Sequence, residues 1–214
     1  KLIGSAGQSL GAFGVRGLTI NVEGDANDYV GKSLSGAKIV LKPHKNSRIK
    51  SSDNTIIGNT CLYGATSGLL FAAGHAGERF AVRNSGATTV VEGCGSNGCE
   101  YMTGGNVIIL GQTGDNFGAG MTGGMAFVYD FDKKFKYRVN DETLVFHYIQ
   151  SNYWENILKD FVKAHYSETN STHAKKIIEN WENEKLNFIQ ICPKEIIHTL
   201  KEPTIETINK RKIT

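Results

Sequence analysis

The sequence has few cysteines, no long apolar run and no strong excess of charge, and each shortage excludes a class of protein. The four cysteines, Cys61, Cys94, Cys99 and Cys192, are unevenly placed and form no C-x-x-C pair. We therefore expect reduced thiols rather than a disulfide framework or a zinc site, and the spacing of Cys94 and Cys99 supports a metal only weakly. No apolar run approaches the roughly 20 residues that a membrane helix needs, and the amino terminus lacks the charged and apolar blocks of a signal peptide. These absences favour a soluble cytoplasmic protein.

The net charge of +3 indicates no particular partner. Charged residues are spread along the chain, apart from a short basic cluster at the carboxyl end: Lys210, Arg211 and Lys212. That cluster is too small for a nucleic-acid surface. We expect neither nucleic acid nor membrane as a partner, and we expect the polar end from Pro203 onward to be frayed.

Glycine is abundant, but it is confined to one part of the chain: the last of the 25 glycines is Gly124, and the remaining 90 residues contain none. In the glycine-rich part, six short segments resemble one another, each after an anchor residue that precedes a glycine: Arg16, Ser35, Ser67, Ser85, Thr103 and Thr122. The steps between anchors are 19, 32, 18, 18 and 19 residues. The long step contains a polar stretch, residues 42–54, which we interpret as a surface insertion.

A second series of glycines supports this repeat. Gly77, Gly95 and Gly114 each lie eight residues before an anchor, and Gly58 lies nine before Ser67. A period of 18 or 19 residues is too short for two helices, but it suits one coil of a parallel β-helix, in which each coil pairs with its neighbours. Glycine suits the tight corners of such coils, because they need φ > 0 and leave no room for Cβ.

The alternation after each anchor predicts which side chains face inward. The fourth and sixth positions should point into the core: Ile20 and Val22, Ile39 and Leu41, Phe71 and Ala73, Thr89 and Val91, Val107 and Ile109, Ala126 and Val128. The fifth position should face outward, and it becomes apolar along the chain: Asn21, Val40, Ala72, Val90, Ile108 and Phe127. Because an apolar stripe of this size is usually a contact surface, we expect the glycine-free region or a partner to cover it.

Helical periodicity begins at Asn152 in the glycine-free region. Two apolar faces follow, one made of Trp154, Ile157, Leu158, Phe161, Val162 and His165, the other of Ala174, Ile177, Ile178 and Trp181. Asn170 or Ser171 is a suitable N-cap for the second helix. We also expect a strand over residues 188–192 and a short helix from Pro193 that carries Ile196 and Ile197. The predicted domains are a β-helix over residues 1–140 and a helical extension over residues 141–214, which packs on the solenoid or caps its last coil.

Three glycine-rich motifs resemble nucleotide-binding loops, but they fail on context. The stretch "GDANDYVGKS", residues 24–33, ends like a phosphate loop, yet Ala26 stands where the first glycine of that loop belongs. Residues 93–98 and 118–123 match G-x-G-x-x-G, which must open a helix to hold a pyrophosphate. All three lead into predicted strands. We interpret them as corners of coils, with Asp25, Asn27 or Asp28 supplying hydrogen bonds in the first.

The sequence also offers no clear catalytic set. His75 is the one histidine in the predicted solenoid core, and nothing ties it to a cysteine nucleophile. Four charged residues are expected to be exposed or to form ion pairs between adjacent coils: Glu78, Arg79, Arg83 and Glu92. We predict no catalytic, cofactor-binding or metal-binding residue and no cofactor.

Several long segments resemble a known family. The segments "NTIIGNTCLYGATSG", "AGERFAVRNSGATTVVEGCGSNGCEYMTGG" and "GQTGDNFGAGMTGGMAFVYD" are similar to the carboxyl-terminal glycine-repeat domain, G-x-G-x-G, of the glutamate synthase large subunit. The likeness continues into "HYSETNSTHAKKIIENW" and "FIQICPKEI" and covers nearly the whole chain. Asn170 departs from the glycine expected in this tail, although asparagine adopts similar turns.

The resemblance implies a right-handed parallel β-helix with an architectural role. In glutamate synthases, an amidotransferase domain carries a catalytic cysteine and a separate barrel binds FMN and an iron–sulfur cluster, and the sequence resembles neither. The resemblance therefore implies a noncatalytic structural or assembly domain, whose partners are glutamate synthase-like catalytic domains or other copies of itself. The alternatives are a subunit of a split glutamate synthase, active only with partner chains, and a stand-alone solenoid that binds a small ligand. Because Lys1 lies inside the first coil, we expect a processed chain or a first strand outside this sequence.

Overall fold

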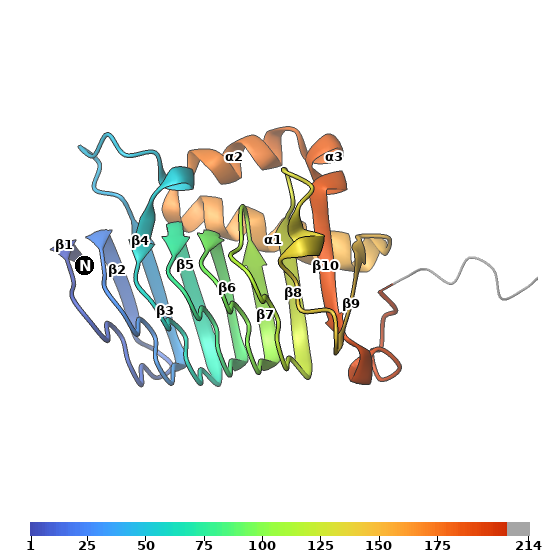
Figure 1. Ribbon diagram of the computed structural model, residues 1–214. Coiled ribbons are helices and arrows are strands. Elements are labelled where there is room, and N and C mark those ends of the chain that lie inside the picture. The colour runs from blue at the N-terminus through green and yellow to red at the C-terminus, as the bar shows by residue number, and fades with distance from the viewer. Residues whose placement is uncertain (205–214) are drawn as a thin grey trace, which may run out of the picture.

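A computed structural model describes residues 1–204, so most of the end predicted to fray lies outside the described residues. The chain forms a right-handed β-solenoid of about seven turns, with helices near the carboxyl end (Figure 1). The strands are β1 (Leu2–Ser5), β2 (Thr19–Asp25), β3 (Ser35–Lys42), β4 (Thr55–Ile57), β5 (Ser67–Ala76), β6 (Ser85–Cys94), β7 (Thr103–Ile109), β8 (Gly123–Tyr129), β9 (Leu144–Tyr148) and β10 (Phe188–Pro193). The α-helices are α1 (Asn152–Thr169), α2 (Thr172–Glu179) and α3 (Trp181–Glu184). The 3-10 turns are η1 (Ser51–Asp53), η2 (Phe135–Tyr137), η3 (Lys185–Asn187) and η4 (Lys194–Ile196).

The main sheet stacks one strand from each coil. Its order is β1-β2-β3-β5-β6-β7-β8-β10-β9, and the strands from β1 to β8 pair in parallel. The outward-facing row runs in register through Val40, Phe71, Val90, Ile108 and Phe127. The repeat read from the anchors therefore corresponds to stacked coils, as predicted.

The prediction that Phe71 and Ala73 face inward is wrong. Between β3 and β5 the register shifts, because Ser35 lies opposite Ser67 while Lys38 lies opposite Leu69. The coil of Ser67 thus uses one residue fewer before the paired segment, and a slip of one residue exchanges the two faces of a strand. In consequence Leu70 and Ala72 join the inner core, and Phe71 joins the outer cluster.

The second series of glycines is required by close packing, since none of its members has a positive φ. A Cβ on Gly77 would lie 2.2 Å from Oδ1 of Asn59, and one on Gly114 would lie 2.3 Å from the backbone nitrogen of Ser96. Several left-handed corners are instead occupied by other residues, such as Leu62 (φ 59) and Cys99 (φ 58). Glycine was predicted for two reasons, a positive φ and a lack of room for Cβ. Only the lack of room explains this series.

The helices α1 and α2 cover the outer face of the sheet (Figure 1). Leu158 and Val162 of α1, together with Ile177 of α2, are buried in one cluster with the outward-facing row. Of the two covers expected for the apolar stripe, the glycine-free region or a partner, the structure shows the glycine-free region. Burial of this stripe holds the helices against the sheet through the hydrophobic effect.

The two ends of the solenoid differ. At the last coil, β10 pairs antiparallel with β8, and β9 then pairs with β10. The edge of β8 is thus covered by a strand, while the helices lie on the side of the solenoid rather than over its last coil. At the first coil, β1 pairs with β2 and has no second strand partner among residues 1–204.

Candidate functional site

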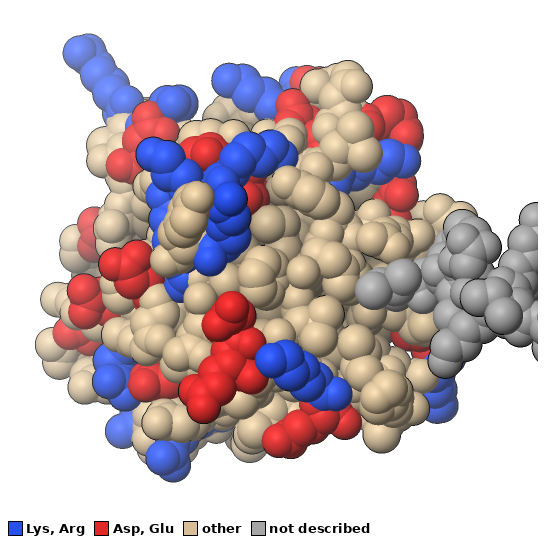
Figure 2. Space-filling model, turned by 45° about the vertical axis from the view of Figure 1, so that its right-hand side comes forward, with Lys and Arg blue, Asp and Glu red and all other residues tan. Residues whose placement is uncertain are grey.

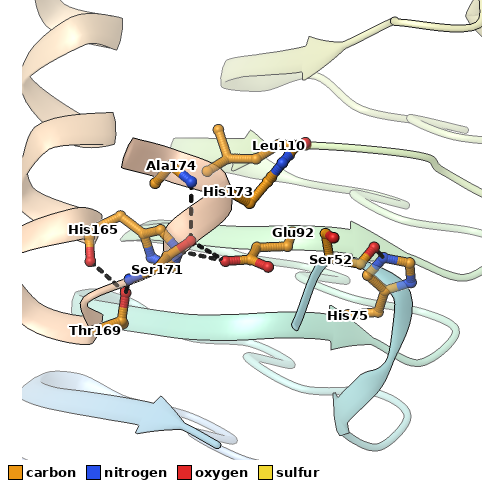
Figure 3. A network of polar contacts seen from close by, with 9 residues as sticks. All are labelled: Ser52, His75, Glu92, Leu110, His165, Thr169, Ser171, His173 and Ala174. Atoms are coloured by element: carbon orange, nitrogen blue, oxygen red, sulfur yellow. Dashed lines mark hydrogen bonds and ion pairs between the residues drawn. The ribbon is translucent and has the colours of Figure 1, made fainter. Parts of the chain in front are cut away.

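Polar side chains converge where the end of β6 meets α1, α2 and the turn η1 (Figure 3). Glu92 comes from β6, His165 from α1 and Ser171 from the junction between the helices. Asn170 ends α1 in the left-handed conformation (φ 57), and this turn brings Ser171 to the start of α2. The side chain of Ser171 caps α2, so the structure selects Ser171 from the two predicted N-caps.

The three side chains form one buried network. Glu92 and His165 are 1% and 0% exposed, and Nε2 of His165 lies 3.5 Å from Oε1 of Glu92. The hydroxyl of Ser171 donates to the same carboxylate oxygen, and it accepts from the backbone N–H of Ala174 at 3.0 Å. The hydroxyl of Thr169 donates to the carbonyl of His165 at 2.6 Å. Glu92 was expected to be exposed or paired between adjacent coils; instead it joins the sheet to both helices.

The electrostatics favour a charged Glu92. Burial disfavours the carboxylate, but the hydrogen bond and charge of His165, with the hydroxyls of Ser171 and Ser51, outweigh burial and hold the pKa of Glu92 below its usual 4.5. Through Oε1 this buried carboxylate contacts both helices. The alternation could have located this residue, since Glu92 follows Val90 on the same outward face.

Two further histidines are bound to backbone carbonyls. Nε2 of His75 lies 2.6 Å from the carbonyl oxygen of Ser52, and Nε2 of His173 lies 2.5 Å from that of Leu110. Because a carbonyl oxygen can only accept, both Nε2 atoms carry the proton. His75 therefore braces the turn η1 against β5.

The cysteines are free thiols, and all four are buried. Burial raises the pKa of Cys61 and of Cys94 to about 12, and it raises the pKa of Cys192 to about 11. Since the thiolate is the nucleophile and the metal ligand, this rise in pKa disfavours both roles for these thiols at neutral pH. Residues 1–204 contain no group of three or more histidine, cysteine or acidic side chains that could hold a metal ion.

The glycine-rich motifs are corners of coils, as predicted. The stretch from Gly24 to Ser33 begins at the end of β2 and leads into β3. Residues 93–98 begin at the end of β6 and lie before β7, and residues 118–123 end on the first residue of β8. At the first corner, Oδ1 of Asp28 accepts from the backbone N–H of Asn59 at 2.8 Å. One coil lower, Oδ1 of Asn59 accepts from the backbone N–H of Glu78 at 2.8 Å. These two side chains therefore link the corners of successive coils by hydrogen bonds.

One of the predicted ion pairs between coils is present. Nη2 of Arg79 lies 3.5 Å from Oε2 of Glu100 in the next coil, whereas Arg83 lies over the ring of Tyr101 at 5.9 Å. Within the described part of the chain, no helix combines the length and the apolar character required to cross a membrane.

Comparison with known proteins is consistent with this architecture. A family model described as "GXGXG motif" matches residues 1–194. The chain is 58% identical over 203 residues to a glutamate synthase [NADPH] large chain of Azospirillum brasilense, covering 95% of this chain and 13% of that protein. It is 49% identical over 192 residues to the corresponding large chain of Bacillus subtilis, covering 89% of this chain and 13% of the relative. A ferredoxin-dependent glutamate synthase 2 of Synechocystis is 48% identical over 190 residues, again covering 89% of this chain and 12% of the relative. The chain thus spans about an eighth of these relatives.

Proposed function

Because the chain belongs to the GXGXG-motif family and matches a segment of glutamate synthase large chains, we propose that it is a noncatalytic structural module. In this proposal it holds glutaminase and FMN or iron–sulfur domains of a glutamate synthase-like assembly in their relative positions. We also propose a cytoplasmic location. The chain would not be an enzyme by itself.

The observation that carries the proposal is an exposed apolar surface on the first coil. Ile3 and Phe13 are 67% exposed and Val15 is 61% exposed, and all three lie in this coil. Exposed apolar side chains gathered on one part of a surface mark contacts with other proteins. The first coil is therefore the surface through which we expect other domains to attach.

The placement of the polar groups supports a structural role. Glu92 and His165 are buried against each other, and the thiols are buried in the solenoid or under the helices. None of these groups combines reactivity with exposure, which a catalytic group needs in order to touch a substrate. Their contacts instead hold elements of the fold together.

Activity measurements test whether the chain acts alone. We expect the purified chain to be colourless and to form no glutamate from glutamine and 2-oxoglutarate. Formation of glutamate by this chain alone would overturn the structural proposal. Glutamate formation that appears only after partner chains are added would instead identify it as a subunit of a split glutamate synthase.

Affinity capture from the native cell tests the contact surface. We expect the wild-type chain to retain polypeptides that carry glutaminase or FMN domains, identified by mass spectrometry. The double variant Ile3→Lys, Val15→Lys should no longer retain these polypeptides. It places two charges on the apolar surface of the first coil while altering only exposed side chains. Leu186→Lys is the matched control, since Leu186 is also exposed but lies in η3, beyond the last coil. Equal retention by all three proteins would show that the first coil is not the contact.

A further inference from the structure

A cavity of about 560 Å³ lies between the turn η1, the ends of strands β5 to β8 and the helix α2. Small-molecule sites in proteins have volumes of about 300–1,000 Å³. Its walls come from six separate parts of the chain, four of which are represented by Ser52, His75, Leu110 and His173. The contacts from His75 to Ser52 and from His173 to Leu110 hold these walls in place (Figure 3). The cavity is therefore part of the fold, and nothing in the proposed function uses it.

One wall presents a flat aromatic surface. The rings of Tyr129 and Phe131 stack with centroids 6.3 Å apart and an interplanar angle of 27°, and Phe131 is 57% exposed. The hydroxyl of Tyr129 donates to Glu184, so it is not available to a ligand. The rings of His173 and Tyr129 lie edge to face, with their centroids 6.1 Å apart. This wall suits the face of a ring rather than a polar group.

Four charged side chains line the cavity: those of Lys50, Asp53, Glu92 and Lys176. Lys50 pairs with Asp53 at 2.8 Å, and the carboxylate of Glu92 is buried and contacts His165 and Ser171. Lys176 lines the cavity from α2 and forms no ion pair among residues 1–204. Thr172, the first residue of α2, also lines the cavity and lies at the positive end of the helix dipole. On the face that Figure 2 shows, basic side chains gather at the upper left together with some acidic ones, next to an uncharged surface.

From these observations we propose that the cavity binds a small organic anion that contains a flat ring. The ring lies against Phe131, and the anionic group lies between Lys176 and the start of α2. Nucleoside monophosphates and aromatic carboxylates share this chemistry. The site is independent of the first coil, so its failure would leave the assembly role untouched.

Calorimetric titration with paired probes tests the proposal. Adenosine monophosphate is compared with adenosine, and benzoate with benzamide, so that each pair differs in its anionic group. We expect at least one of the two anions to bind saturably and about tenfold more tightly than its uncharged partner. Which of the two anions binds shows whether the site prefers a phosphate or a carboxylate. Absence of saturable binding by both anions, or equal binding of anion and uncharged partner, would overturn the proposal.

Variants separate the site from nonspecific attraction. Lys176→Gln and Phe131→Ala should each weaken the binding of that anion about tenfold. Lys175→Gln is the matched control on the same helix, because Lys175 is exposed, pairs with Glu179 and does not line the cavity. The melting temperature of each variant checks that the fold is retained. An equal loss of affinity in Lys175→Gln and Lys176→Gln would show general attraction to a basic surface and would reject the site.

Discussion

The two faces of the main sheet are both apolar, yet they are covered in different ways. The inner face packs coil upon coil, with residues such as Ile39, Leu70 and Val107 in one continuous core. The outer face packs against α1 and α2, where Ile108 and Phe127 meet Leu158. The inner packing repeats with every coil, whereas the outer packing is made once by helices that have no repeat.

This difference shows why the polar network lies on the outer face. Apolar contact is nondirectional, so an apolar stripe alone leaves a helix free to slide along the sheet. Glu92 receives contacts from His165 and Ser171, and thereby ties both helices to one position on β6. The inner face needs no such tie, because the hydrogen-bonded ladder between coils already sets its register.

The largest expected effect comes from placing a charge on the covered face. Ile108→Glu should destabilise the fold by about 4 kcal/mol or more, because an unpaired charge would be buried between the sheet and the helices. Urea unfolding followed by circular dichroism measures the loss.

Asn21→Glu is the matched control for this variant. Asn21 lies in the same outward row, in register with Val40, but it is exposed. We expect a change within about 0.5 kcal/mol. If both variants unfold at the same urea concentration, the helices do not cover the sheet in solution.

The next largest effect concerns Glu92, which joins β6 to α1 and α2. Glu92→Gln should cost about 2 kcal/mol at pH 7, since it removes the charge that His165 and Ser171 contact. Urea unfolding at pH 7 measures this cost. Glu78→Gln, at an exposed corner, should change stability little.

The same pair of proteins tests the pH dependence. Because the pKa of Glu92 is held below 4.5, the stabilisation by its charge is fully present above that value and is lost as the pH falls through the lowered pKa. The difference between wild type and Glu92→Gln should therefore shrink in acid. A constant difference from pH 7 to pH 3 would contradict the assignment of a charged Glu92.

A smaller effect is expected for crowding between coils. A Cβ on Gly123 would lie 2.1 Å from the carbonyl oxygen of Thr103, so Gly123→Ala should cost about 1–3 kcal/mol. Gly17 has φ +94 but nothing within 4 Å, so Gly17→Ala should cost about 1 kcal/mol through backbone strain alone. Thermal unfolding distinguishes the two variants. A larger loss of stability in Gly17→Ala than in Gly123→Ala would show that backbone strain costs more than the close contact between coils.

The smallest effect concerns the helix cap. Ser171→Ala should cost about 1 kcal/mol, because the hydroxyl accepts from Ala174 and donates to Glu92. Ser151 precedes α1 without a capping hydrogen bond from its side chain, so Ser151→Ala should cost less. Equal melting temperatures of the two variants would show that Ser171 does not help to hold α2 against β6.

Much of the fold was predictable from local pattern. The phased glycines and anchors predicted the coils, and the apolar fifth positions predicted a covered outer face. The slip at Phe71 was not predictable, because the shift lies in how Ser67 and Leu69 pair with the strand before them. The polar site was missed for a similar reason: His165 and Ser171 lie 73 and 79 residues from Glu92 in the chain.

By itself, the sequence determined the period of the coils, the positions where glycine is needed and the helical character of the glycine-free region. Each of these depends on residues close together in the chain. Only the tertiary structure decided that α1 and α2 lie on the side of the solenoid, that β10 covers its last coil and that Glu92 joins sheet to helices. Those outcomes depend on contacts between distant segments, whose free energy is realised only once the sheet has formed a face for them to bury.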